Sequence, residues 1–147
     1  MEITLPDEAA TVRLGTAIAG VLRRGDAVCL SGGLGAGKTT LARALIRALT
    51  RPEEEVPSPT FTLVQAYEAR EFPVAHFDFY RLDSAAEAEE LGLDEALADG
   101  AVVIEWPERL GERRPPDRLD VGLAVEGEGR RARLARHGSW SGRELGF

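Results

Sequence analysis

The sequence has little cysteine, little lysine and no long uncharged stretch, and each shortage excludes a class of protein. Its single cysteine, Cys29, has no partner for an internal disulfide, so we expect the reducing environment of the cytoplasm. No run without a charged residue, residues 27–37 included, is long enough to cross a bilayer, so we expect no membrane association. Residues 1–4 lack the basic region of a signal peptide, which agrees with a cytoplasmic location.

Acidic residues outnumber basic ones, 25 against 18, and give a net charge of −7. A uniformly acidic surface repels phosphate backbones, so the overall charge does not predict tight binding to nucleic acid. The charge is uneven, because residues 109–147 contain more arginines than acids. This segment is either a basic patch or a solvated face. With 147 residues and 44% hydrophobic residues, the chain is expected to form one domain, residues 1–147.

Lysine occurs only once, at Lys38, while the other 17 basic residues are arginines. Lysine carries a compact ammonium group, whereas arginine carries a planar fork, so the two are not interchangeable where shape matters. A chain so rich in arginine that keeps one lysine suggests that position 38 requires the ammonium group.

The apolar spacing alternates between helical and extended periods along the chain. We predict helices over residues 7–24, 39–50 and 85–98, and strands over residues 27–30, 61–67, 74–79, 101–104, 119–125 and 130–136. Several strands are short continuous apolar runs, which is typical of strands buried in a parallel sheet. The expected fold is therefore α/β: a single P-loop NTPase domain with a central, mostly parallel sheet flanked by helices and a C-terminal antiparallel hairpin.

A glycine-rich segment between the first predicted strand and the second predicted helix fits the pattern G-x-x-x-x-G-K-[ST], from Gly32 to Thr39. The glycines permit positive φ angles and bring successive backbone N–H groups around a polyphosphate. Lys38 has the reach to contact the β- and γ-phosphates, and the Thr39 hydroxyl is a ligand for Mg²⁺. This segment predicts nucleotide binding.

A P-loop enzyme also needs an acid at the end of a neighbouring strand to orient Mg²⁺. Two residues qualify: Glu105 follows the apolar run 101–104, and Asp78 ends the shorter run 74–77. The pattern leaves open which of the two serves the metal. His76 lies on the same strand face as Asp78, and we expect it to be a structural hydrogen-bonding group.

The lysine count also indicates which nucleotide is bound. The guanine-specifying motif [NT]-K-x-D requires a lysine, and the only lysine of this chain already lies in the phosphate loop. We therefore expect ATP.

Four motifs together resemble the bacterial TsaE family over nearly the whole chain. They are residues 35–40 (GAGKTT), 58–64 (SPTFTLV), 76–81 (HFDFYR) and 105–107 (EWP), in that order. The phosphate loop alone is unspecific, whereas its combination with the second and third strings is specific. Members of this family are small ATPases that take part in making threonylcarbamoyladenosine in tRNA.

The resemblance implies roles for individual residues. Thr39 and Glu105 are expected to coordinate Mg²⁺. Asp78 is expected near the γ-phosphate or the attacking water, and Asp78 and Lys38 are the two expected catalytic residues. Residues 58–62 are expected to act as a nucleotide-sensing switch loop. The implied nucleotide contacts are Thr11, Gly35, Ala36, Gly37, Lys38, Thr39, Thr40 and Arg133.

The resemblance also implies partners. They are the paralogous pair TsaB and TsaD, of which TsaD carries the group transfer to tRNA, so tRNA is reached only indirectly. The chain departs from the family at Gly33, where members commonly have aspartate. This change removes a negative charge near the phosphates, so nucleotide affinity or the hydrolysis rate is expected to differ.

Two other functions remain open from the residues alone. A small-molecule kinase would use residues 109–118 as a lid, whereas a nucleotide-gated binding module would bind ATP through Lys38 without cleaving it. Arg81 is either a charge-stabilising group in the site or a structural residue at a strand end.

Overall fold

The chain forms seven strands and four α-helices, and the computed structural model describes all 147 residues. The strands are β1 (Glu2–Leu5), β2 (Ala27–Ser31), β3 (Val64–Tyr67), β4 (Val74–Asp78), β5 (Ala101–Glu105), β6 (Arg118–Glu126) and β7 (Gly129–Arg136). The α-helices are α1 (Glu8–Val21), α2 (Lys38–Leu49), α3 (Ala86–Glu90) and α4 (Leu93–Asp99). Two 3₁₀ helices cover Pro107–Arg113 and Gly138–Trp140.

All seven strands belong to one sheet, in the order β1-β7-β6-β2-β5-β4-β3. The four central strands, β6, β2, β5 and β4, run parallel, while β1, β7 and β3 are added antiparallel at the two edges. The structure confirms the predicted α/β fold, with its parallel centre and its C-terminal hairpin of β6 and β7. In a parallel sheet the carboxyl ends of the strands meet at one edge, and in open α/β sheets ligands bind there.

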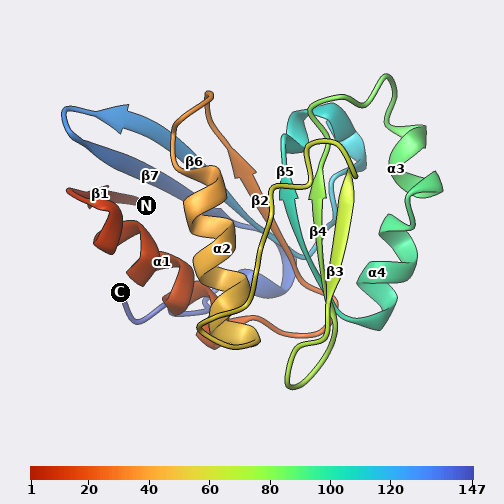
Figure 1. Cartoon of the computed structure of the whole chain (residues 1–147), viewed down its shortest axis with the longest axis horizontal. Helices are drawn as coiled ribbons and strands as arrows, with labels where there is room; N and C mark the ends of the chain where they lie inside the picture. The colour runs from red at the N-terminus through yellow and green to blue at the C-terminus, as the bar shows by residue number, and fades with distance from the viewer.

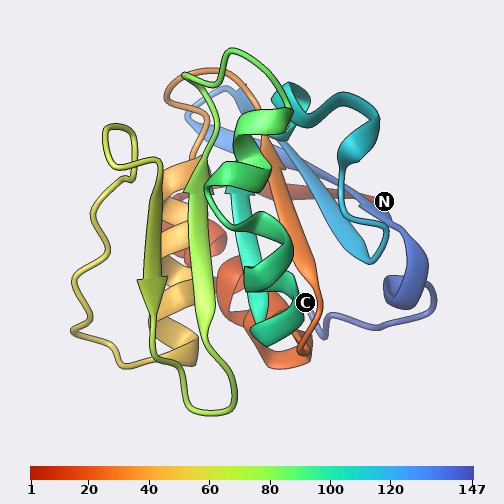
Figure 2. The same ribbon diagram turned by 90° about the vertical axis from the view of Figure 1, so that its right-hand side faces the viewer.

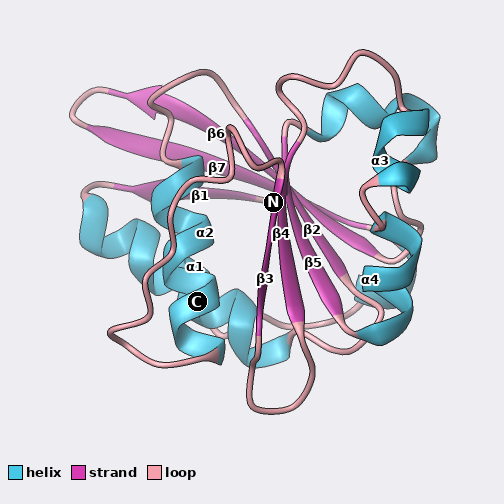
Figure 3. Cartoon of the chain, turned by 45° about the vertical axis from the view of Figure 1, so that its right-hand side comes forward, coloured by secondary structure: helices cyan, strands magenta, loops and turns pink.

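Helices cover both faces of the sheet (Figures 1 and 3). Helices α1 and α2 pack on one face, and α3 and α4 lie across the other, in front of β4 and β5 in Figure 2. Side chains alternate along each strand, so one strand serves both layers. Val28 and Leu30 of β2 join the core beneath α1 and α2, whereas Ala27 and Cys29 join the core beneath α3 and α4.

The two long predicted helices both form, for recognisable local reasons. The Asp7 carboxylate accepts a hydrogen bond from the Ala10 N–H at 2.8 Å and so caps the start of α1. Helix α2 follows the glycine-rich segment directly and buries the apolar stripe that contains Leu41 and Leu45. None of the helices is both long enough and apolar enough to cross a membrane.

The structure differs from the sequence predictions in three details: two predicted elements have other bounds, and one strand was missed. The helix predicted over 85–98 is two short helices, because Gly92 adopts a positive φ of 88° that ends α3 and begins α4 at a new angle. The strand predicted over 61–67 begins only at Val64, after Leu63 adopts a positive φ of 70°. Strand β1 was not predicted, because its pairing with β7 lies far along the chain.

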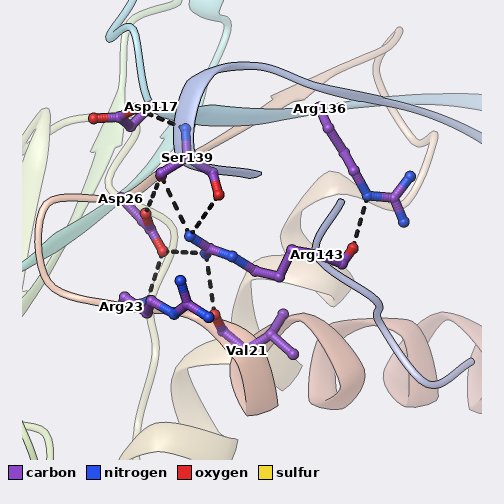
Figure 4. A network of polar contacts seen from close by, with 7 residues as sticks. All are labelled: Val21, Arg23, Asp26, Asp117, Arg136, Ser139 and Arg143. Carbon is purple, nitrogen blue, oxygen red and sulfur yellow. Dashed lines mark hydrogen bonds and ion pairs between the residues drawn. The ribbon is translucent and has the colours of Figure 1, made fainter. Parts of the chain in front are cut away.

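The C-terminal segment is tied to the amino end of β2 by a buried polar network (Figure 4). The Arg143 guanidinium donates Nη1 to Asp26 Oδ2 at 2.6 Å and to the Val21 carbonyl at 3.1 Å. Ser139 Oγ donates to Asp26 Oδ1 at 3.3 Å, and the Arg143 guanidinium lies 4.2 Å from the centre of the Trp140 ring. Buried charges are tolerated when they are paired and hydrogen-bonded, as these are.

Candidate nucleotide-binding site

The loop between β2 and α2 has a backbone that only glycine adopts readily. Gly32, Gly35 and Gly37 have φ angles of 136°, 77° and 103°. A Cβ at Gly32 would lie 2.3 Å from the Leu123 carbonyl oxygen, so a larger residue has neither the angle nor the space. No side chain caps the start of α2, so its first N–H groups have no side-chain acceptor. Such a helix start favours a bound anion.

Lys38, at the first position of α2, is buried and its ammonium group bends back over the loop. Its Nζ donates to the Gly33 carbonyl at 3.1 Å and to the Gly32 carbonyl. The same atom lies 4.1 Å from the centre of the Trp106 ring, within the range of a cation–π contact. Burial lowers the pKa of Lys38, while the nearby Glu105 carboxylate acts in the opposite direction. The ammonium group therefore contacts only neutral partners, namely two backbone carbonyls and an indole ring.

Asp78 and Glu105 occupy matching positions at the carboxyl ends of β4 and β5. They are register partners in the parallel pair, and only 5% and 3% of their surfaces are exposed. Asp78 Oδ1 accepts from the Tyr80 N–H at 2.9 Å, and Oδ2 accepts from the Thr60 hydroxyl at 3.3 Å. No ion pair joins either carboxylate to Lys38 in the described chain. The strand pairing thus brings the two predicted acids together.

His76 lies two residues before Asp78 and is fully buried. Its Nε2 forms a hydrogen bond with Glu105 Oε2 at 2.7 Å. The structure therefore confirms His76 as a hydrogen-bonding group and identifies its partner as the carboxylate at the end of β5.

These groups line a cavity of about 350 Å³, within the usual range of a small-molecule site. The cavity brings together eight of the residues that the sequence predicts: Gly35, Ala36, Gly37, Lys38, Thr39, Thr40, Asp78 and Glu105. Ser58 and Thr60 of the expected switch loop also line it, as does Arg81. Residues that are far apart in the sequence thus face one space.

Two predicted nucleotide contacts do not line this cavity. Thr11 is buried within α1, with 3% of its surface exposed. Arg133 lies on β7 and pairs with Glu2 across the edge of the sheet, with an Nη2 to Oε1 distance of 2.9 Å. Most of the Arg133 side chain is exposed to solvent. Their contact with the nucleotide stays a prediction from the resemblance.

Arg130, which was not predicted from the sequence, lies at the cavity instead. Its Nη2 donates to the Gly35 carbonyl at 3.0 Å, and its side chain passes close to Gly37. The signal was present in the sequence, because alternation along β7 places residue 130 on the same face as the buried Ala132 and Leu134. The exposed Arg133 lies on the opposite face.

An aromatic pair forms another wall of the cavity. Trp106 and Tyr80 have ring centres 4.8 Å apart, and both line the cavity. Trp106 has a positive φ of 62°, a strained conformation for a residue with a side chain. This backbone turn directly after Glu105 brings the indole ring over the Lys38 ammonium group.

The site fits Mg²⁺ only together with a phosphate ligand. Among all 147 residues there is no group of three or more histidine, cysteine or acidic side chains that could hold a metal ion alone. Mg²⁺ in nucleotide sites needs only one or two protein oxygens, with phosphate and water oxygens completing its shell. Thr39, Glu105 and Asp78 all line the cavity and supply oxygens of this kind.

Comparisons with known proteins agree with this arrangement. The family profile described as "Threonylcarbamoyl adenosine biosynthesis protein TsaE" matches residues 5–133. A protein from Rickettsia felis, named tRNA threonylcarbamoyladenosine biosynthesis protein TsaE, is 38% identical over 88% of this chain and 75% of its own length. A protein of the same name from Mycobacterium tuberculosis is 41% identical over 82% of this chain and 76% of its own length.

The fold also has a solved counterpart. The crystal structure of Bacillus subtilis YdiB superposes with a TM-score of 0.77 and 26% sequence identity, covering 94% of this chain and 86% of YdiB. The motifs, the fold and the matches over most of the chain agree with one another. The chain therefore belongs to the TsaE family, which takes part in the biosynthesis of threonylcarbamoyladenosine in tRNA.

Proposed function

We propose that the chain is a Mg²⁺-dependent ATPase that acts as an accessory switch in the modification of tRNA to N6-threonylcarbamoyladenosine. One observation carries the proposal: Lys38, Asp78 and Glu105, from three separate elements, face one cavity beside a phosphate loop. None of these charged groups is neutralised by an oppositely charged protein partner in the cavity, so their charges remain available to a nucleotide and its metal.

The proposed roles follow from position. The N–H groups of the loop and of the first turn of α2 surround the phosphates, and Lys38 exchanges its loop carbonyls for phosphate oxygens. Thr39 and Glu105 hold Mg²⁺, which when bound neutralises charge on the phosphate oxygens. Asp78 orients water near the terminal phosphate, since it lies at the same edge of the sheet. Arg130 adds a guanidinium group beside the loop.

The switch loop has a direct connection to the proposed catalytic acid. Thr60 donates to Asp78, and Ser58 is hydrogen-bonded to Thr60 at 2.8 Å. A terminal phosphate that competes for these hydroxyl groups would change the position of residues 58–62. Ordering of a loop by the terminal phosphate is an established kind of nucleotide switch. We propose that this loop reports the nucleotide state to a partner.

The partner that we propose is the TsaB–TsaD complex, with tRNA reached through it. The acidic net charge of −7 supports this indirect arrangement, because the chain has no overall attraction for a phosphate backbone. The adenine nucleotide is proposed because the one lysine lies in the phosphate loop. The buried, unpaired Cys29 supports a cytoplasmic location.

Phosphate release tests the proposal. P-loop enzymes without a complete set of catalytic groups turn over at about 10⁻⁴ to 10⁻² s⁻¹, so we expect slow release from Mg–ATP by the chain alone. Addition of the TsaB–TsaD pair and tRNA should change that rate. Equal rates with and without the partners would contradict the switch.

Product analysis separates the two rival functions. A phosphorylated small molecule in place of free phosphate would indicate a kinase. Saturable ATP binding with no phosphate release under either condition would indicate a nucleotide-gated binding module.

A further inference from the structure

His76 is completely buried beside the proposed metal site but does not line the cavity. It lies in the middle of β4, with its side chain on the same sheet face as Asp78. Its register partner on β5 is Val103, so Glu105 is its diagonal neighbour two residues further along that strand. The imidazole therefore contacts the Glu105 carboxylate from within the protein, behind the cavity.

The hydrogen bonds of His76 indicate which ring nitrogen carries the proton. Nε2 lies 2.7 Å from Glu105 Oε2, whereas Nδ1 is buried and has no hydrogen-bond partner. A carboxylate only accepts, so the proton lies on Nε2 and is donated to Glu105. The unpartnered Nδ1 then carries only a lone pair.

This contact leaves Glu105 with two unequal oxygens. Oε2 is occupied by His76, while Oε1 has no hydrogen-bond partner and is not sealed inside the protein. Since Glu105 lines the cavity, the accessible oxygen is the one that faces it. Asp78 differs, because both of its oxygens accept hydrogen bonds from neighbouring residues.

We infer that His76 is a positioning residue: it holds one oxygen of Glu105 so that the other is presented to a divalent cation bound with the nucleotide. The inference rests on the proposed Mg²⁺–nucleotide site. Groups that orient a metal ligand from behind typically change metal affinity by about 10- to 100-fold when they are replaced. His76 acts through Glu105 and does not itself contact the nucleotide cavity.

Two amide substitutions test this geometry. In His76→Gln the amide nitrogen reaches approximately the position of Nε2 and still donates, whereas in His76→Asn it reaches only the position of Nδ1. The measurement is calorimetric binding of a non-hydrolysable ATP analogue, with and without Mg²⁺. We expect His76→Asn to lose about 10- to 100-fold of the Mg²⁺-dependent gain in affinity, with little change in the absence of Mg²⁺. His76→Gln should keep most of the gain.

The outcomes separate this inference from the proposed function. A wild-type chain that gains nothing from Mg²⁺ would overturn both. A normal gain that Glu105→Gln abolishes and His76→Asn preserves would overturn only the positioning role. Equal losses with and without Mg²⁺ in His76→Asn would also overturn it, since a general distortion of the cavity would then explain the effect.

A second readout needs neither nucleotide nor metal. Nitrogen-15 NMR of the imidazole distinguishes the two neutral tautomers in the intact wild-type chain. We expect His76 to carry its proton on Nε2, and this signature should persist in the absence of Mg²⁺. A proton on Nδ1 would overturn the proposed contact, even if the substituted chains failed to fold.

Discussion

The two ends of strand β2 both hold buried charges but treat them in opposite ways. At the amino end, Asp26 is paired with Arg143 at 2.6 Å and accepts further hydrogen bonds from the Ser139 hydroxyl and the Arg23 N–H. At the carboxyl end, Lys38 donates hydrogen bonds to the carbonyl oxygens of its own loop. Two buried carboxylates face the same cavity, but neither forms an ion pair with Lys38. One end is closed by the protein, whereas the other is left for a ligand.

This contrast distinguishes a structural charge cluster from a functional one in the same fold. A buried ion pair favours one arrangement of the chain, because removal of either member leaves an uncompensated buried charge. Buried charges that contact only neutral partners are costly to the folded protein and are retained where a ligand completes them. Substitutions at the two ends of β2 test that contrast.

Arg143→Ala should have the largest effect on stability. It leaves the Asp26 carboxylate buried without its partner, and removal of one member of a buried ion pair costs about 3–5 kcal/mol. Urea unfolding of the two chains measures the difference. Arg133→Ala, at a mostly exposed ion pair, is the matched control and should leave the unfolding midpoint nearly unchanged. Equal effects of the two substitutions would contradict a structural role for the network.

Lys38→Ala should have the opposite effect: it should weaken ATP binding and leave the stability of the fold intact. Loss of a charged hydrogen-bond donor to phosphate is expected to weaken ATP binding by about 100-fold. Stability should not fall, because burial lowers the pKa of Lys38 and thus opposes the charged form in the folded state. Calorimetric titration with ATP measures the first effect and urea unfolding the second. A chain that loses stability while keeping ATP affinity would reverse the assignment of the two ends.

Arg130→Ala tests which arginine of β7 belongs to the nucleotide site. Its guanidinium lies against the phosphate loop, so we expect about tenfold weaker binding of ATP. Arg133→Ala, three residues along the same strand but on the opposite face, should bind ATP as the wild type does. A loss at Arg133 with none at Arg130 would support the contact implied by the family resemblance over the one seen in the structure.

Cys29, in the middle of β2, should show only a small effect that depends on pH. Burial raises the pKa of its thiol from 9.0 to about 12. An acid whose pKa is raised on folding loses stability as the pH rises through the unfolded value, here over the window from about 9 to 12. Between pH 8 and pH 9.5 the wild type should lose about 0.8 kcal/mol more unfolding free energy than Cys29→Ala does. Parallel pH profiles of the two chains would contradict the burial of an inert thiol.

The sequence predicted the carboxyl end of β2 far better than the amino end. The phosphate loop is contiguous, and each of its residues has a local task, so Gly32 to Thr39 could be recognised without any structure. Asp78 and Glu105 were found because each ends an apolar strand, although only the strand pairing shows that they are adjacent. The signal for this end lies in short stretches of sequence.

The features that were missed depend on contacts between distant residues. The Asp26–Arg143 pair joins residues 117 positions apart, and no local pattern distinguishes Arg143 from the other arginines of the segment. Strand β1 forms by antiparallel pairing with β7, in which Glu2 lies opposite Arg133. Gly92 was treated as one residue of a long helix, although its positive φ divides that helix in two. Each of these features depends on tertiary contacts, which a local sequence pattern does not show.

The most direct test of the central claim is phosphate release from Mg–ATP by the intact chain and by Asp78→Asn, each measured beside its ATP affinity. Asp78→Asn keeps the size of the side chain and one of its two acceptor oxygens but removes the charge at the end of β4. We predict slow release by the wild type, and a loss of release in Asp78→Asn with ATP affinity largely retained. Equal release by the two chains, or none from a wild type that binds ATP, would contradict the account.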